Sequence, residues 1–183
     1  LITGVSSGLG AHFARLFAKA GANIVLGARR ADKVAALAAE LTAAGTGALA
    51  ISLDVTDEAS LKAAYDAAEA RFGTVDTIIA NAGTSAAGRS TEISDADVRM
   101  VTDTNFIGVY LTAREGARRL IAAGSRETSS RICEGCGNYI VTRTHSTDID
   151  EQPQHGCPPA ARTVAFVPYQ SSEQAAEINR RRA

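Results

Sequence analysis

Apolar residues in the first 121 positions follow two alternating patterns. Short continuous apolar runs, each typical of a buried strand, occur at residues 1–3, 23–27, 48–53 and 76–80. Between these runs, apolar residues recur every three or four positions, which predicts amphipathic helices. A glycine closes each of the first three predicted helices, at Gly21, Gly45 and Gly73.

Strands that alternate with helices, and that are apolar along their length, predict a parallel sheet with helices on both faces. Ligands of such sheets bind at the carboxyl ends of the strands, near the point where the strand order reverses. Glycines or polar residues follow the first, third and fourth predicted strands. We therefore expect an α/β, doubly wound fold with a ligand site at this edge of the sheet.

A fourth helix is predicted after residue 94. Ser94 and Asp97 form a capping-box pattern at its start, and Val98 and Val101 begin its apolar stripe. Asn105 lies four residues after Val101 and therefore falls on the same stripe. A buried amide must find hydrogen-bond partners, either as an ordinary core residue or within an active site. We favour the active-site role for Asn105.

Composition narrows the class of protein. The chain has 183 residues, of which 45% are hydrophobic and 21% charged, values that suit one globular domain with a sizeable core. A net charge of −1 argues against nucleic acid or an anionic membrane as partner, and no apolar run approaches the ~20 residues of a transmembrane helix. The three cysteines lie in one late segment and do not suggest a disulfide framework. We expect a cytoplasmic protein and, because the chain starts with Leu1 inside a strand, a cut N-terminus.

The stretch "LITGVSSGLG" joins the first strand to the first helix. Glycines spaced G-x-x-x-G-x-G lack a Cβ, so the backbone can pass close to a pyrophosphate, and the start of the next helix offers free N–H groups. The alternative is a glycine-rich turn that only packs the helix onto the strand. Its position between strand and helix favours nucleotide binding. The residues expected to contact the nucleotide here are Gly4, Ser6, Ser7, Gly8, Leu9 and Gly10.

Two further loops follow strand ends. Asp54, with Val55 after it, can accept a hydrogen bond from an adenine amino group, or else cap the next helix, a task also open to Asp57. The "NAG" loop can lie against a cofactor because its residues are small, or else form an ordinary turn. Its members are Asn81, Ala82 and Gly83.

Taken together, "TGVSSGLG", "LDVTD", "NAG" and Asn105 in "TDTNFIGVYL" resemble the short-chain dehydrogenase/reductase family, in family order, over residues 1 to about 132. The resemblance implies a Rossmann-type sheet and an NAD(P)-dependent oxidoreductase that moves hydride between the nicotinamide and a small carbonyl or alcohol substrate. In the family a Tyr acts as acid/base, a Lys lowers its pKa, a Ser holds the substrate oxygen, and a helix Asn anchors a proton-relay water. Asn105 matches this last role and is our one catalytic candidate.

The charge after the second strand bears on the choice of cofactor. NAD-preferring proteins place an acid there, which bonds the ribose 2′-hydroxyl. This chain reads "GARR", with Arg29 and Arg30 in that place, and arginine can pair with a 2′-phosphate. The alternative is two solvated arginines at the start of a helix. We predict NADP(H), with NAD possible.

The rest of the family pattern is missing after Ile132. A fifth strand, beginning near Arg131, would end at the catalytic Ser and precede a Tyr-x-x-x-Lys helix, but no such sequence follows. Tyr139 is followed four residues later by an arginine, and Tyr169 by Glu173, whose negative charge cannot depress a tyrosine pKa. We therefore expect the chain to be effectively inactive, and we do not expect the oligomer typical of the family.

Residues 133–183 are predicted to form an irregular, poorly ordered tail after a dinucleotide-binding domain of residues 1–132, a Rossmann-type sheet truncated at both ends. Cys133 and Cys136 make half of a zinc site, but His155 and Cys157 complete it poorly, so we expect no metal. The tail indicates a reading-frame error or a truncated or chimeric reading frame; an ordered divergent extension is the alternative. The alternative function is a non-catalytic nucleotide-binding protein with an interaction or zinc-binding tail.

Overall fold

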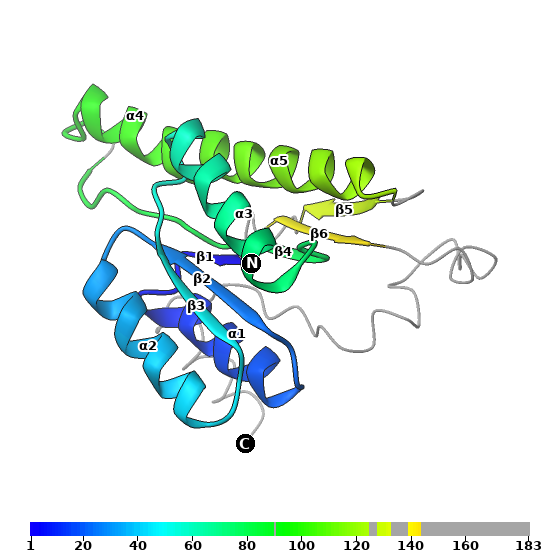
Figure 1. The fold of residues 1–183 in the computed structure, drawn as a ribbon. Helices are drawn as coiled ribbons and strands as arrows, with labels where there is room; N and C mark the ends of the chain where they lie inside the picture. Colours follow the sequence, from blue (N-terminus) through cyan, green and yellow to red (C-terminus); the bar gives the residue numbers. More distant parts are fainter. Residues whose placement is uncertain (90, 125–127, 133–138, 144–183) are drawn as a thin grey trace, which may run out of the picture.

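The computed structural model describes residues 1–89, 91–124, 128–132 and 139–143, and the side chains of the first two of these ranges. A sheet lies between two layers of helices (Figure 1). Its strands are β1 Ile2–Thr3, β2 Ile24–Ala28, β3 Ala48–Ser52, β4 Thr77–Ala80, β5 Thr128–Ile132 and β6 Tyr139–Arg143. The helices are α1 Gly8–Lys19, α2 Ala31–Ala43, α3 Glu58–Phe72, α4 Asp95–Thr102, the π-helical segment η1 Asp103–Ile107, and α5 Gly108–Ala122.

The strand order in the sheet is β3-β2-β1-β4-β6-β5. The first four strands are parallel, with Ile2 of β1 opposite Leu26 of β2 on one side and opposite Ile79 of β4 on the other. The chain therefore builds outward from β1 to β3 and then returns to the far side of β1, which places the reversal of strand order between β1 and β4. This arrangement confirms the predicted doubly wound α/β fold.

The other edge of the sheet differs from the all-parallel expectation. β6 pairs antiparallel with β4, with Thr77 opposite Thr142 and Ala80 opposite Tyr139, and β5 pairs antiparallel with β6. Tyr139, and Arg143 four residues after it in the place of the family's lysine, are thus the two ends of β6. The spacing of apolar residues does not reveal the direction of a strand, because the free N–H and C=O groups at a sheet edge can pair with a parallel or an antiparallel strand.

The segment assigned to the tail therefore contributes β6 to the sheet. The division into a domain of residues 1–132 and a tail stays a prediction. Several residues discussed above lie outside the described part of the chain: Cys133, Cys136, His155, Cys157, Tyr169 and Glu173.

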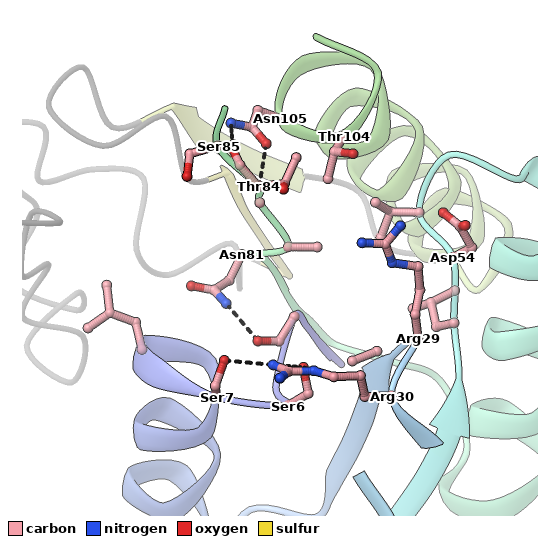
Figure 2. Close-up of a pocket in the computed structure, with 17 residues that line it drawn as sticks. Ser6, Ser7, Arg29, Arg30, Asp54, Asn81, Thr84, Ser85, Thr104 and Asn105 are labelled. Carbon is pink, nitrogen blue, oxygen red and sulfur yellow. Dashed lines mark hydrogen bonds between the residues drawn. The ribbon is translucent and has the colours of Figure 1, made fainter. Parts of the chain in front are cut away.

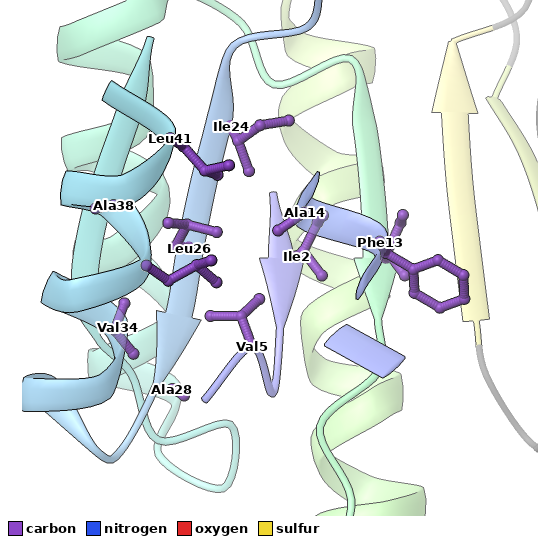
Figure 3. Close-up of a cluster of buried hydrophobic side chains, with 12 residues drawn as sticks. Ile2, Val5, Phe13, Ala14, Ile24, Leu26, Ala28, Val34, Ala38 and Leu41 are labelled. Carbon is purple, nitrogen blue, oxygen red and sulfur yellow. The ribbon is translucent and has the colours of Figure 1, made fainter. Parts of the chain in front are cut away.

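Successive residues of β2 point to opposite faces of the sheet and enter different hydrophobic cores. Ile24, Leu26 and Ala28 pack in the core that α1 and α2 cover (Figure 3). Val25 packs on the opposite face, in the core that contains Tyr65 of α3 and residues of α5. Because both faces of β2 are buried, β2 must be apolar at every position, which explains its continuous apolar run in the sequence.

The predicted helix ends are confirmed at the first three helices. The glycines after α1, α2 and α3 have φ of 87°, 88° and 81°, a conformation that side chains with a Cβ rarely adopt. Asp57 caps α3 by accepting a hydrogen bond from the Ala59 N–H at 2.9 Å. Ser94 caps α4, as its capping-box pattern predicted.

Candidate functional site

A cavity of about 630 Å³ lies at the carboxyl ends of β1, β2, β3 and β4. This volume is within the range of small-molecule sites. Figure 2 shows side chains from all four strand ends, and from the η1 segment, around one hollow. The lining residues are Gly4, Ser6, Ser7, Leu9, Ala28, Arg29, Arg30, Leu53, Asp54, Val55, Asn81, Ala82, Gly83, Thr84, Ser85, Thr104 and Asn105.

The glycines of the first loop have different tasks. A Cβ on Gly4 would lie 2.7 Å from the Ala82 Cα, and one on Gly10 would meet the Gly4 carbonyl oxygen, so both let backbone segments pack together. Gly8 has φ of 59°, and a Cβ there would have no atom within 4 Å. Gly4 and Gly10 therefore serve to pack the helix onto the strand, as the alternative interpretation of this loop proposed. Gly4 also lines the cavity, whereas Gly10 does not. Gly8 shapes the turn and leaves open space beside the start of α1.

The start of α1 has free hydrogen-bond donors. The first N–H groups of any α-helix lack intrahelical partners, and the extended Ser7 that precedes Gly8 makes no side-chain hydrogen bond to them. Such a helix start attracts anions through its N–H groups and its dipole. Ser6 and Ser7 line the cavity beside it.

The two arginines after β2 differ in their contacts. The Arg30 guanidinium donates to Ser6 Oγ at 2.8 Å and to Ser7 Oγ at 2.9 Å, which links α2 to the glycine loop (Figure 2). Arg29 lies on the other side, where its positive charge contributes to lowering the pKa of Asp54. Both arginines line the cavity, so two positive charges flank the part of it near β2 and β3.

Asp54 does not cap α3, since Asp57 does. Its Oδ1 accepts hydrogen bonds from the Thr56 N–H at 2.9 Å and from the Thr56 hydroxyl at 2.7 Å. These bonds, first the backbone one and then the hydroxyl one, together with the charge of Arg29, hold the pKa of Asp54 below its usual value. Asp54 is therefore an ionised acceptor at neutral pH, fixed by one oxygen at the edge of the cavity.

Asn81 ties the end of β4 to the end of β1. Its Nδ2 donates to the Thr3 carbonyl at 3.0 Å, and its backbone N–H donates to Thr3 Oγ1 at 3.0 Å. The Ala82 N–H also donates to Thr3 Oγ1, at 3.0 Å. The "NAG" loop is therefore held against the glycine loop by side chains as well as backbone.

Asn105 lies in a different place from the one its spacing predicted. It is exposed and not on a buried stripe; Val98, which defined that stripe, is itself 53% exposed. The reason is that α4 has no buried residue, so its apolar stripe is not covered by core; Asn105 itself follows α4, in the wider η1 turn. The amide is nevertheless paired: it donates to the Thr84 carbonyl and accepts from the Thr84 N–H, both at 2.8 Å.

The structure thus brings most of the predicted residues to one cavity. Gly8 and Gly10 support it without lining it. Sequence reasoning missed Thr3, which organises the site from below, and the wall formed by Thr84, Ser85 and Thr104. Thr3 carries a recognisable signal, a hydroxyl directly before the first glycine at the end of an apolar strand. Thr84, Ser85 and Thr104 have no such signal, because threonine and serine are equally common in loops and helices without a binding role.

The described part of the chain contains neither a metal-binding cluster nor a membrane-spanning helix. In those ranges no group of three or more His, Cys, Asp or Glu side chains is placed to hold a metal ion. None of the helices described is both long and apolar enough to cross a lipid bilayer.

Known proteins share this sequence and arrangement. The family model described as short chain dehydrogenase matches residues 1–133. Among curated proteins, a cis-4-hydroxycyclohexanecarboxylate dehydrogenase of Sinomonas cyclohexanicum is 42% identical over 68% of this chain and 50% of its own length. Momilactone A synthase of Oryza sativa subsp. japonica is 38% identical over 80% of this chain and 56% of its own. The chain spans about half the length of these relatives.

Solved structures agree with the fold. An alcohol dehydrogenase from the archaeon Thermococcus sibiricus, complexed with 5-hydroxy-NADP, is 33% identical with a TM-score of 0.63, and the match covers 67% of this chain and 53% of that one. A short chain dehydrogenase/reductase from Burkholderia phymatum, in complex with NAD, is 34% identical with a TM-score of 0.65, covering 67% of this chain and 43% of that one.

Proposed function

The chain belongs to the short-chain dehydrogenase family, and from that premise we propose that its cavity binds a nicotinamide dinucleotide, with NADP(H) preferred over NAD(H). Relatives with solved structures hold both kinds of cofactor. The observation that carries the proposal is the convergence of a glycine loop, a free helix start, two arginines and an ionised Asp54 on one cavity.

Each wall of the cavity suits one part of the dinucleotide. The open side of Gly8 and the N–H groups at the start of α1 suit the pyrophosphate. Asp54 keeps an acceptor oxygen for the adenine amino group while Thr56 holds the other. Asn81, Ala82 and Gly83 form the floor towards Asn105, and we assign the nicotinamide to this end of the cavity. When bound, the reduced cofactor would donate a hydride to a carbonyl carbon, and the oxidised cofactor would accept one from an alcohol carbon.

We assign the preference for NADP(H) to Arg29, with Arg30 beside it. Guanidinium groups can pair with the extra 2′-phosphate of NADP(H), whereas an acid in this place would repel it. The Arg30 guanidinium already donates hydrogen bonds to Ser6 Oγ and Ser7 Oγ. The Arg29 side chain points away from the glycine loop, towards Asp54 (Figure 2), so it is the arginine with more donors available to a phosphate.

The test compares NADPH and NADH binding to the full chain by fluorescence titration. Arg29→Asp is expected to weaken NADPH by about 2 kcal/mol, or some thirtyfold, because a charge pair becomes a repulsion, and to leave NADH nearly unchanged. Lys33→Asp is the matched control, since Lys33 is an exposed cation of α2, four residues after Arg29, and does not line the cavity. An equal loss of affinity for both cofactors would show that Arg29 does not recognise the 2′-position.

We propose further that this chain binds the cofactor without turning over a substrate. Its described tyrosines are followed four residues later by Glu69, Arg114 or Arg143, never by the lysine that lowers a tyrosine pKa in the family. Tyr65 is buried, and desolvation raises its pKa further. Asn105 does not titrate, so it cannot replace the missing acid and base.

Loss of an acid/base unit lowers the rate by roughly three or more orders of magnitude. Mixing the purified chain with NADPH and a panel of carbonyl compounds is therefore expected to give no measurable oxidation of NADPH. Turnover by this chain would overturn the proposal of inactivity and leave the proposal of cofactor binding intact. The substrate class, the cytoplasmic location and the oligomeric state stay predictions from the sequence and the family.

A further inference from the structure

Gly108 is the first residue of α5, and its backbone lies directly on the loop after β3. A Cβ at this position would lie 2.6 Å from Val55 Cγ2, 3.1 Å from Val55 Cβ and 3.2 Å from the Val55 carbonyl oxygen. Gly108 is buried, and Val55 is only 6% exposed. The contact therefore leaves no room for a side chain at position 108.

Each partner in this contact is joined to one side of the cavity. Val55 lines the cavity next to Asp54. Gly108 follows η1, the turn that carries Asn105, and Asn105 holds the opposite wall through its two hydrogen bonds with Thr84. The contact is therefore a direct packed connection between the Asp54 side and the Asn105 side.

The material between the two sides is continuous core. Leu53 and Val55 form one small buried cluster with Leu61 and Ala64 of α3, and Ala82 and Leu111 pack against it. Ala82 belongs to the "NAG" loop and Leu111 to the first turn of α5, so the cluster joins the Asp54 loop to the "NAG" loop and to α5. Packed cores of this kind transmit a displacement because they contain little free volume.

We infer that Gly108 is a positioning residue: its contact with Val55 sets the width of the cavity between Asp54 and Asn105. This inference rests on the proposed dinucleotide function, because that width is what a dinucleotide must match from adenine to nicotinamide. A methyl group at position 108 has no flexible neighbour to displace, since Val55 is β-branched with a stiff χ1 and the third atom is backbone. One of the two backbone segments must therefore move.

The experiment measures NADPH affinity and thermal unfolding of the full chain with Gly108→Ala. We expect the dissociation constant to rise about tenfold, because misplacement of binding groups by a fraction of an ångström is costly in a preformed site. Gly116→Ala is the matched control: it lies on the same helix, and its Cβ would come 2.7 Å from Tyr65 Oη and 2.8 Å from Ile78 Cδ1, away from the cavity lining. Gly116→Ala should lower the unfolding temperature without changing the dissociation constant.

Rescue separates positioning from general damage. Val55→Ala removes both γ-methyl groups, including the atom closest to position 108, so NADPH affinity in the Val55→Ala/Gly108→Ala double variant should return to within about threefold of Val55→Ala alone. Equal loss in Gly108→Ala and Gly116→Ala, wild-type affinity in folded Gly108→Ala, or absence of rescue would each overturn the inference.

A second readout does not depend on the cofactor. The side-chain amide of Asn105 gives its own NMR signal, and we expect Val55→Ala to shift it while Gly116→Ala leaves it in place. An unchanged signal in Val55→Ala would contradict the inference even if Gly108→Ala fails to fold. If the wild-type chain binds no NADPH, the proposed function fails, and this signal alone still decides whether the two sides of the cavity are coupled.

Discussion

Thr3 is a single buried hydroxyl on which two loops of the cavity depend. It is 1% exposed, and its Oγ1 accepts hydrogen bonds from the backbone N–H groups of both Asn81 and Ala82, each at 3.0 Å. The Asn81 side chain returns a hydrogen bond to the Thr3 carbonyl. At the scale of one residue, the ends of β1 and β4 are therefore joined by side chains where the sheet ladder stops.

Replacing Thr3 with Val is expected to lower the free energy of unfolding by about 2 kcal/mol, because it keeps the shape but leaves two N–H groups unpaired. Urea unfolding of both proteins measures the change. Thr3→Ser keeps the hydroxyl and should lose less, mainly the transfer energy of one methyl group. If Val and Ser are equally destabilising, the hydroxyl does not hold the "NAG" loop.

At the scale of elements, residues 95–122 form one helical run with a change of period inside it. α4 is capped by Ser94, whose Oγ accepts a hydrogen bond from the Asp97 N–H at 3.1 Å and donates to Asp97 Oδ2 at 2.7 Å. η1 then replaces the α-helical turn over Asp103–Ile107 before α5 continues. The wider turn presents Asn105 to the Thr84 loop, so a local change of helix type places the one catalytic candidate.

Ser94→Ala is expected to lower the free energy of unfolding by about 1 kcal/mol, the usual contribution of an N-cap. The pair is exposed and outside the cavity lining, so NADPH affinity should not change. Chemical denaturation gives the stability, and Ser94→Thr, which keeps the acceptor oxygen, serves as the control. A loss of affinity in Ser94→Ala would mean that the start of α4 also sets the position of the site.

At the scale of the molecule, Arg119 fastens α5 to α3 across the outer layer. Its guanidinium donates to Asp66 and Glu69 of α3 and to Glu115 of α5, at 2.7, 2.7 and 2.8 Å, and it lies over the Tyr65 ring. The Arg119 side chain is 15% exposed, so the cluster is screened less than a surface ion pair. Tyr65 beneath it donates a hydrogen bond to the Thr112 carbonyl at 2.8 Å.

Arg119→Met should lower the free energy of unfolding by about 2 kcal/mol, because it leaves half-buried carboxylates without their common partner. This value is below the cost of a fully buried pair, since Asp66 is 59% exposed. Arg15→Met offers a comparison, because Arg15 pairs with Glu40 at an exposed site and should contribute little. Similar losses in both variants, by thermal or urea unfolding, would show that the α3–α5 cluster has no special role.

The sequence by itself determined where along the chain the first four strands and the helices between them occur, because buried strands read as continuous apolar runs and the helices as runs with a period of three to four. It also determined the capping of α4 and the loops that meet at the cavity, since parallel strands bring their carboxyl ends to one edge. Gly4, Asp54 and Asn81 could be identified for that reason.

Only the tertiary structure decided the rest. The antiparallel placement of β5 and β6 is not written in side-chain spacing, because the free edge of β4 can pair with a strand of either direction. The exposure of Asn105 was not predictable because the apolar stripe of α4 has no core packed on it, and the π-helical turn that carries Asn105 is not visible in a 3.6-residue period. The roles of Thr3 and Gly108 arise from contacts between residues 78 and 53 positions apart in the chain, and such contacts exist only once the elements have packed.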